Sequence, residues 1–211
     1  SSTSRGLGDV YKRQVYENVE IDYRMSSLKA KDILAILNGE KSETLPTVIE
    51  STENDNLFVF WSGHGVPGAM CWDEEPYAMT GDDLSTVFKD MNLKRRYRKL
   101  LMMVEACFSG GVMEQCEGIP GMLFITAANG DETSKADVFN GEMKVWMSNR
   151  FTSTFIEQIT DNKDVAMRDL YYRLFINTVG SHVMVYNAEN YGNLYSADMS
   201  EFINFKNDKS K

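Results

Sequence analysis

"FVFWSGHGVPGAM", Phe58–Met70, runs from a continuous apolar segment into a glycine-rich loop that holds His64, one of two histidines in the chain. "LLMMVEACFSGGVM", Leu100–Met113, has the same form, because an apolar run ends at Glu105 and Cys107 and then passes into glycines. Such apolar runs are typical of strands buried on both faces of a parallel sheet. Consecutive strands are often neighbours, and ligands bind where the strands end. We therefore predict that His64 and Cys107 face one crevice at the carboxyl edge of a sheet.

The other periodic segments alternate between strands and helices. Apolar spacing predicts helices over 30–37, 80–91, 148–160 and 164–179, and strands over 57–61, 100–104, 122–127 and 182–186. We expect Thr80 and Asp83 to form a capping box, Gly39 to end the first helix, and Asp164 to cap the last. The alternation predicts an α/β fold with a mostly parallel sheet and helices on both faces.

Composition narrows the class of protein. The chain has 211 residues, of which 43% are hydrophobic and 25% charged, which suits one globular domain. A net charge of -9 argues against a nucleic-acid-binding surface. No apolar run approaches the roughly 20 residues of a membrane span.

The chain has three cysteines, Cys71, Cys107 and Cys116. An odd number without CxxC spacing predicts neither a disulfide framework nor a structural zinc site. A bridge between Cys71 and Cys116 stays open from the sequence alone. We interpret both as packing or surface thiols.

The first fourteen residues, "SSTSRGLGDVYKRQ", have no apolar periodicity and no secretory apolar core. They resemble a translated sequencing-adapter tail of the kind found at the ends of metagenomic gene fragments. We interpret 1–14 as non-native and 15–211 as the folded domain. The gene is then expected to be cut at its 5′ end and to lack its first strand. This leaves the compartment open, including a secreted or periplasmic one.

The residue types at the two strand ends suit nucleophilic catalysis. A cysteine thiolate is a strong nucleophile, and a nearby imidazole can activate it or protonate a leaving amine. The backbone N–H groups of Gly65 and Cys107 could stabilise an oxyanion. A lone histidine is more often structural, and a lone cysteine is more often a small core residue. His64 and Cys107 each follow an apolar strand and lie among glycines, and this shared pattern favours catalysis. A redox-sensing thiol at Cys107 would not explain why His64 lies in a matching loop.

"FWSGHGVPG" (60–68) and "MMVEACFSGG" (102–111) resemble the two catalytic blocks of the legumain family of cysteine peptidases. Three more segments extend the resemblance to about 15–205: "VEIDYRMSSLKAKDILAILNGE" (19–40), "ITAANGDETS" (125–134) and "GSHVMVYNAEN" (180–190). The resemblance implies a three-layer caspase-like fold, a peptide or protein substrate, and neither a metal nor an organic cofactor.

The resemblance also implies roles for individual residues. Cys107 corresponds to the nucleophile and His64 to the general acid and base. Glu105 corresponds to a carboxylate of the S1 pocket, which receives the substrate side chain before the cleaved bond. Thr133 and Ser134 correspond to a pair of residues that wall this pocket.

This chain departs from the family pattern at several places. The family's first strand ends in an asparagine and an arginine, and nothing in 1–57 matches that segment. Gly63 replaces an aspartate before the histidine, and Asn149 replaces an acidic residue on the far wall of S1. We therefore expect weaker selection for asparagine at P1, the residue before the cleaved bond. We interpret His182 as structural, because it lies inside an apolar strand run.

These observations predict a cysteine endopeptidase that forms a thioester on Cys107. Two alternatives stay open. One is a catalytically inactive caspase-like scaffold or binding fragment. The other is a transamidase or peptide ligase that uses the same site. The sequence predicts no oligomeric state.

Overall fold

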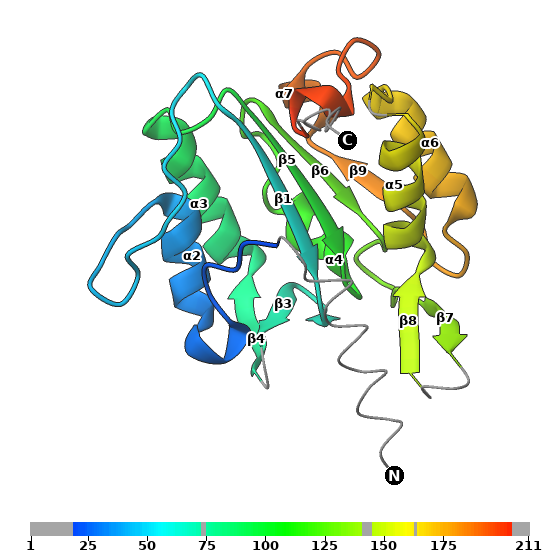
Figure 1. Cartoon of the computed structure of the whole chain (residues 1–211), viewed down its shortest axis with the longest axis horizontal. Coiled ribbons are helices and arrows are strands. Elements are labelled where there is room, and N and C mark those ends of the chain that lie inside the picture. The colour runs from blue at the N-terminus through cyan, green and yellow to red at the C-terminus, as the bar shows by residue number, and fades with distance from the viewer. Residues whose placement is uncertain (1–18, 73–74, 141–144, 163, 204–211) are drawn as a thin grey trace, which may run out of the picture.

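The computed structural model describes residues 19–72, 75–140, 145–162 and 164–203. Its main sheet has the strand order β1-β5-β6-β9 (Figure 1). These strands are β1 (Asn56–Ser62), β5 (Lys99–Glu105), β6 (Met122–Thr126) and β9 (Met184–Tyr186). β1, β5 and β6 are parallel, and β9 is antiparallel to β6. The mostly parallel sheet is confirmed, whereas the predicted tail, 1–14, lies outside the described residues.

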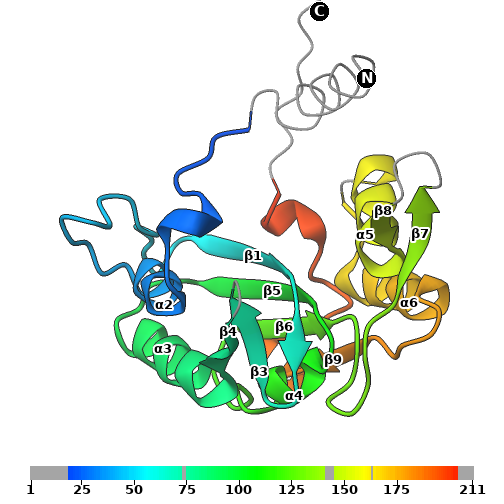
Figure 2. The same cartoon turned by 90° about the horizontal axis from the view of Figure 1, so that it is seen from below.

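Helices cover both faces of this sheet. The helices are η1 (Met25–Ser27), α2 (Ala30–Asn38), α3 (Gly81–Leu93), α4 (Ser109–Glu114), α5 (Arg150–Asp161), α6 (Met167–Asn177), α7 (Ala188–Tyr191) and η2 (Met199–Glu201). α2 and α3 lie on one side, and α5 and α6 lie on the other (Figures 1 and 2). The three-layer architecture predicted from the sequence is thereby confirmed. Among the described helices, none combines the length and the apolarity needed to cross a membrane.

Two small antiparallel sheets, which the apolar periodicity did not predict, extend from the carboxyl edge of the main sheet. One contains β2 (Gly65–Val66), β3 (Ala69–Trp72) and β4 (Glu75–Thr80). The other pairs β7 (Ala136–Asn140) with β8 (Val145–Asn149). The first small sheet follows β1 in the chain, and the second follows β6. Both therefore lie near the edge of the main sheet where the predicted site lies.

The side chains of β5 alternate between two hydrophobic cores, as the twofold period of a strand requires. Leu100, Met102 and Val104 pack in the core formed with α2, α3 and α4. Leu101 and Met103 pack in the core formed with α5, α6 and α7. All five are buried. Burial on both faces explains why the strand reads as a continuous apolar run.

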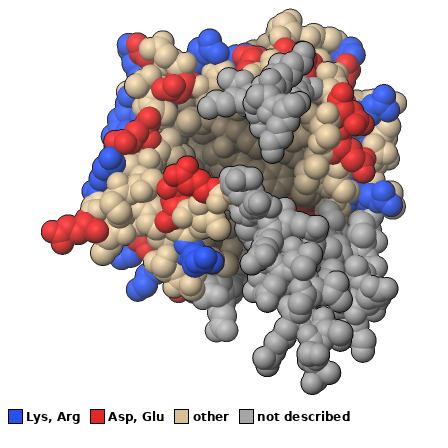
Figure 3. Space-filling model, in the orientation of Figure 1, with Lys and Arg blue, Asp and Glu red and all other residues tan. Residues whose placement is uncertain are grey.

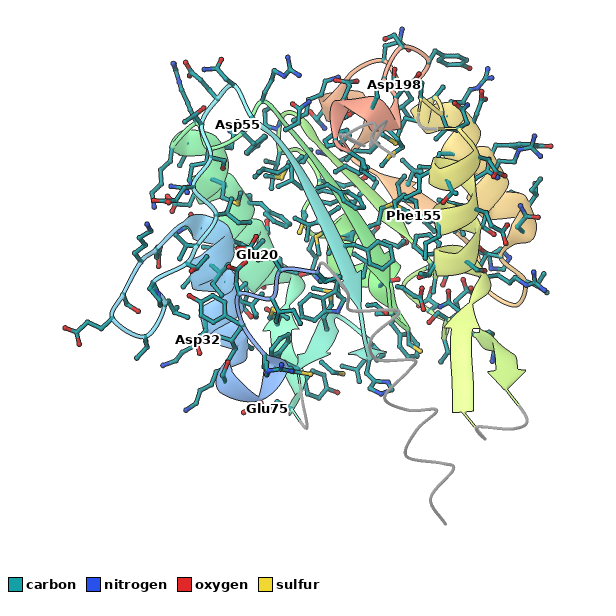
Figure 4. All side chains as sticks on the ribbon, in the orientation of Figure 1. Glu20, Asp32, Asp55, Glu75, Phe155 and Asp198 are labelled. Atoms are coloured by element: carbon teal, nitrogen blue, oxygen red, sulfur yellow. The ribbon has the colours of Figure 1, made fainter. Side chains whose placement is uncertain are left out.

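β1 is less buried than the sequence predicted. Its residues from Asn56 to Trp61 are half-buried, because β1 has a strand partner on only one side among the described residues. Phe155 of α5 points toward the sheet (Figure 4), and its ring centroid lies 5.7 Å from each of the rings of Phe58 and Phe60. These aromatic contacts attach α5 to the strand that precedes His64.

Local helix signals were confirmed in two places and wrong in one. The Thr80 side chain accepts from the Asp83 N–H, and the Asp83 carboxylate accepts from the Thr80 N–H, which is the predicted capping box. Gly39 ends α2 in the left-handed region, at φ 70°. Asp164, however, does not cap α6. The helix begins only after Ala166, because that residue is extended and bridges to Asp198.

Close packing of α4 on the turn after β6 predicts different outcomes for two adjacent glycines. A Cβ at Gly110 would lie 2.8 Å from the backbone of Asn129, whereas a Cβ at Gly111 would lie 3.4 Å from Gly130. We expect Gly110→Ala to lower the free energy of unfolding by about 2 kcal/mol through overpacking. Gly111→Ala, which gains the same helix propensity, should change it by less than about 1 kcal/mol. Urea denaturation of both variants measures the difference, and equal effects would contradict the packing described here.

Candidate active site

The parallel register between β1 and β5 sets the position of the two predicted catalytic residues. Ser62 pairs with Glu105 at the end of both strands, and the Gly63 N–H donates to the Glu105 carbonyl at 3.1 Å. His64 and Cys107 each follow two residues after this pair. The structure therefore places both residues at the same carboxyl edge, as predicted.

Gly65 lies directly against the nucleophile loop. A Cβ at this position would be 2.1 Å from the Cys107 carbonyl oxygen and 3.3 Å from the Ala106 side chain. Only glycine permits this approach. The backbone that could supply oxyanion donors, at Gly65 and Cys107, is therefore held together by direct contact.

His64 stands exposed beside a cavity, and Cys71 lies across from it in the next strand. The Cys71 N–H donates to the His64 carbonyl at 3.0 Å. Both residues line a cavity of about 460 Å³, whose other walls are Tyr23, Met25, Leu28, Ile33, Phe60, Trp61, Ser62, Gly63 and Trp72. Burial, together with the nearby Cys107 sulfur, raises the pKa of the Cys71 thiol. The raised pKa leaves Cys71 less often in the thiolate form, which makes it a poorer nucleophile than an ordinary exposed thiol.

The structure settles the cysteine pairing. No disulfide joins the three cysteines, all of which lie within the described residues. Cys116 is buried in the core beside α2 and α3, and burial raises the pKa of its thiol to about 12. Cys116 is therefore a packing residue, as the sequence suggested.

Cys107 is followed by a strained backbone turn. Phe108 has φ 55°, in the left-handed region, which costs about 1–2 kcal/mol for a residue with a side chain. Its N–H donates to the Glu132 carbonyl at 2.8 Å, and the Gly110 N–H donates to the Ala128 carbonyl at 3.1 Å. These two bonds hold the turn between β5 and α4, so the cysteine is presented at a fixed point.

Ser134 lies at the sulfur of Cys107. The Cys107 Sγ is 3.8 Å from both the carbonyl oxygen and the side-chain hydroxyl of Ser134. Ser134 is half-buried, and the neighbouring Thr133 is exposed. The structure thus brings Ser134 to the predicted nucleophile, whereas a substrate contact by Thr133 stays a prediction.

The carboxyl group of Glu105 has a raised pKa. Burial raises its pKa to about 7, against hydrogen bonds from the Asn149 side chain and the Thr152 N–H, which lower it. One carboxylate oxygen, Oε2, is buried without a hydrogen-bond partner among the described residues. Near neutral pH the carboxyl group is therefore protonated in a large fraction of molecules.

Asn149 has a structural task that the sequence did not show. Its side-chain oxygen accepts from the Thr152 N–H at 3.2 Å, which caps α5. Its side chain also bonds Glu105 and is only 6% exposed. Asn149 therefore lies beside Glu105, as the predicted pocket requires, but it can influence a substrate chiefly through Glu105.

The predicted strand position of His182 is wrong, whereas its structural role stays a prediction. His182 lies before β9 rather than inside the strand, its side chain is 69% exposed, and its Nδ1 is 2.9 Å from Glu132 Oε2. The sequence did not predict the contact between Glu132 and His182. The available signal was that Glu132 lies in the segment 125–134 and His182 in the segment 180–190, both of which carry the family resemblance.

The molecular surface above the sheet is hollowed. Figure 3 shows charged side chains mainly along the rim of this face, while the visible floor of the hollow is largely uncharged.

The described part of the chain contains no group of three His, Cys, Asp or Glu residues placed to hold a metal ion.

The raised pKa of Glu105 predicts a specific dependence of stability on pH. The folded chain binds this proton more tightly than the unfolded chain, so the group destabilises the fold increasingly as pH rises from 4.5 to about 7. Glu105→Gln removes this titration. The free energy of unfolding of the variant relative to the wild type should rise by about 1–2 kcal/mol between pH 4 and pH 8, after allowance for solvent screening. A difference independent of pH in urea denaturation would show that Glu105 titrates normally.

Most of the chain is similar in sequence to known proteins. The model of the Peptidase C13 family matches residues 4–202, a range that includes most of the segment interpreted as a tail. The hemoglobinase of Schistosoma mansoni is 30% identical over 93% of this chain. The GPI-anchor transamidase of Saccharomyces cerevisiae is 25% identical over 80%, and the legumain of Homo sapiens is 27% identical over 82%.

The chain spans less than half the length of these relatives. The matched parts make up 45% of the hemoglobinase, 42% of the transamidase and 41% of the legumain. The similarity therefore concerns the domain that carries His64 and Cys107.

Proposed function

The chain belongs to the Peptidase C13 family, and from that premise we propose that it is a cysteine endopeptidase acting on peptides or proteins. The observation that carries the proposal is the register of β1 and β5, which brings His64 and Cys107 to one edge. The direct contact of Gly65 with Cys107 supports it, because it brings together the two backbone segments proposed to stabilise the oxyanion.

The proposed reaction is an acyl transfer in two steps. The Cys107 thiol transfers its proton to His64, and its sulfur attacks the carbonyl carbon of the cleaved bond, whose resulting oxyanion is stabilised by the N–H groups of Gly65 and Cys107. When the intermediate collapses, the C–N bond breaks and His64 protonates the leaving amine. Water, deprotonated by His64, then attacks the thioester, which releases the acid and restores the thiol.

Glu105, Thr133 and Ser134 form the proposed S1 pocket beside this centre. The position of Ser134 at the Cys107 sulfur supports this assignment. A Glu105 that is protonated in a large fraction of molecules, next to the Asn149 carboxamide, would reduce the negative charge of the pocket near neutral pH. Such a pocket suits a small polar P1 side chain better than a charged one.

A second candidate is a transfer of the acyl group to an amine. The similarity to the yeast GPI-anchor transamidase favours it, because that relative is named for such a transfer. The same thioester would serve both reactions, and the balance depends on whether water or an amine reaches it first. Product analysis in the presence of glycinamide distinguishes the two outcomes.

The thiolate mechanism predicts an ordered series of losses. Cys107→Ala should abolish cleavage of a fluorogenic peptide library by the 211-residue chain, and His64→Ala should lower kcat at least about 100-fold. Cys116→Ala should retain activity, because that thiol is buried in the core. Absence of cleavage by the wild type would support the inactive-scaffold alternative, and cleavage that survives Cys107→Ala would exclude the thioester.

A finer prediction concerns P1 specificity. Asn149→Asp keeps a side chain able to cap α5, but it replaces the hydrogen-bond donor to Glu105 by a second acidic group. We expect the ratio of kcat/KM for asparagine over alanine at P1 to rise, since an acidic residue here would order the pocket more strongly. Asn149→Ser, which also caps helices, is the control. An unchanged ratio in Asn149→Asp would show that this residue does not influence S1.

A further inference from the structure

Three segments that are distant in the chain meet at Glu132. They are the turn after Cys107, the loop 129–134 after β6, and the residues before β9. Each is tied to Glu132 by a hydrogen bond. The first segment directly follows the proposed nucleophile and the second contains Ser134, so a single residue outside the catalytic pair connects the parts of the proposed site.

The Glu132 carboxylate accepts three hydrogen bonds. Oε1 accepts from the Asn129 N–H at 3.0 Å and from the His182 N–H at 2.6 Å. Oε2 faces the His182 Nδ1 at 2.9 Å. Burial alone would raise the pKa of Glu132, but these hydrogen bonds lower it. The group therefore stays a carboxylate at neutral pH and keeps its capacity to accept.

The backbone of Glu132 continues this arrangement toward the nucleophile. Its carbonyl accepts the N–H of Phe108, the strained residue that follows Cys107. Two residues later, Ser134 lies 3.8 Å from the Cys107 sulfur. A shift of Glu132 would therefore move both the turn that presents the sulfur and the residue that touches it.

We propose that Glu132 and His182 are positioning residues, which hold the Phe108 turn and Ser134 in place around Cys107. The inference rests on the proposed function, since it assigns a purpose to the geometry of that nucleophile. Neither side chain has a hydrogen bond to Cys107 or His64 among those of the described residues. The Glu132–His182 pair acts on the reaction through backbone placement.

The pair differs from an ordinary surface ion pair in its surroundings. The Glu132 side chain is only 22% exposed and is bonded on both oxygens, whereas the Lys41–Glu50 pair is 51% and 71% exposed. Carboxylates with several charge-assisted bonds hold their geometry more firmly than exposed pairs do. Glu50→Ala is therefore a suitable control for the loss of a surface acid.

Two substitutions of His182 test whether its hydrogen bond to Glu132, rather than its bulk alone, positions the site. In His182→Asn the carboxamide nitrogen stands where Nδ1 stands, so it can donate to Glu132 Oε2. In His182→Gln the carboxamide nitrogen stands farther out, near the place of Nε2, and cannot make the same bond without a new rotamer. Both variants keep the backbone N–H that bonds Oε1.

The first measurement is hydrogen exchange at the Phe108 amide, read by mass spectrometry of a peptide that spans 105–112, in which Phe108 lies beyond the two residues that lose their label. We expect exchange to be about threefold to tenfold faster in Glu132→Ala and His182→Gln, because a hydrogen bond to a charged group no longer fixes the loop. His182→Asn and Glu50→Ala should exchange like the wild type. Because exchange does not require turnover, this readout decides the inference even if the chain cleaves no peptide.

The second measurement is steady-state cleavage of a peptide substrate. We expect kcat to fall by about tenfold in Glu132→Ala and His182→Gln with KM changed less than about twofold, since small misplacements of a nucleophile chiefly slow the chemical step. His182→Asn should restore kcat to within about twofold of the wild type. Equal exchange in His182→Asn and His182→Gln, with either both fast or both slow, would overturn the positioning role. A wild type that cleaves nothing would instead count against the proposed function.

Discussion

The pairing of β1 with β5 is the constraint on which the site depends. Parallel strands that share one register end at the same level, so the loops after Ser62 and Glu105 leave the sheet side by side. The contact of Gly65 with the Cys107 carbonyl then fixes the distance between the loops. A slip by one residue would turn the alternating side chains of β5 to the wrong cores, and the register is therefore also the one that the hydrophobic packing requires.

Two residues at the same edge of the sheet are in energetically unfavourable states. Phe108 has a left-handed backbone, and Glu105 has a buried oxygen without a partner among the described residues. Each of these features would destabilise an isolated strand end, and each is held here by neighbouring elements. α5 contributes hydrogen bonds to Glu105 through its first turn, and the loop after β6 accepts the Phe108 N–H. Strain and perturbed acids of this kind gather at functional sites because the surrounding fold over-determines them.

Family membership is compatible with Cys107 as the proposed nucleophile, but it does not fix the product of the proposed reaction. Relatives include both peptidases and a transamidase, and the chain corresponds to less than half of each. The proposed thioester on Cys107 would be common to both reactions. In the proposed site, the two reactions would differ in the access of water or amine and in the recognition of P1 by Glu105 and Ser134. Specificity thus resides in the loops around a shared core.

The sequence by itself determined the α/β class, the strands that precede His64 and Cys107, and the ends of α2 and α3. These features depend on apolar periodicity and on capping residues, which act over a few neighbouring positions. Only the tertiary structure decided that Asn149 bonds Glu105, that β1 is half-buried, and that the exposed His182 bonds Glu132. Those contacts join residues up to fifty positions apart, and their energies come from hydrogen bonds and burial that arise only when the distant segments have already packed.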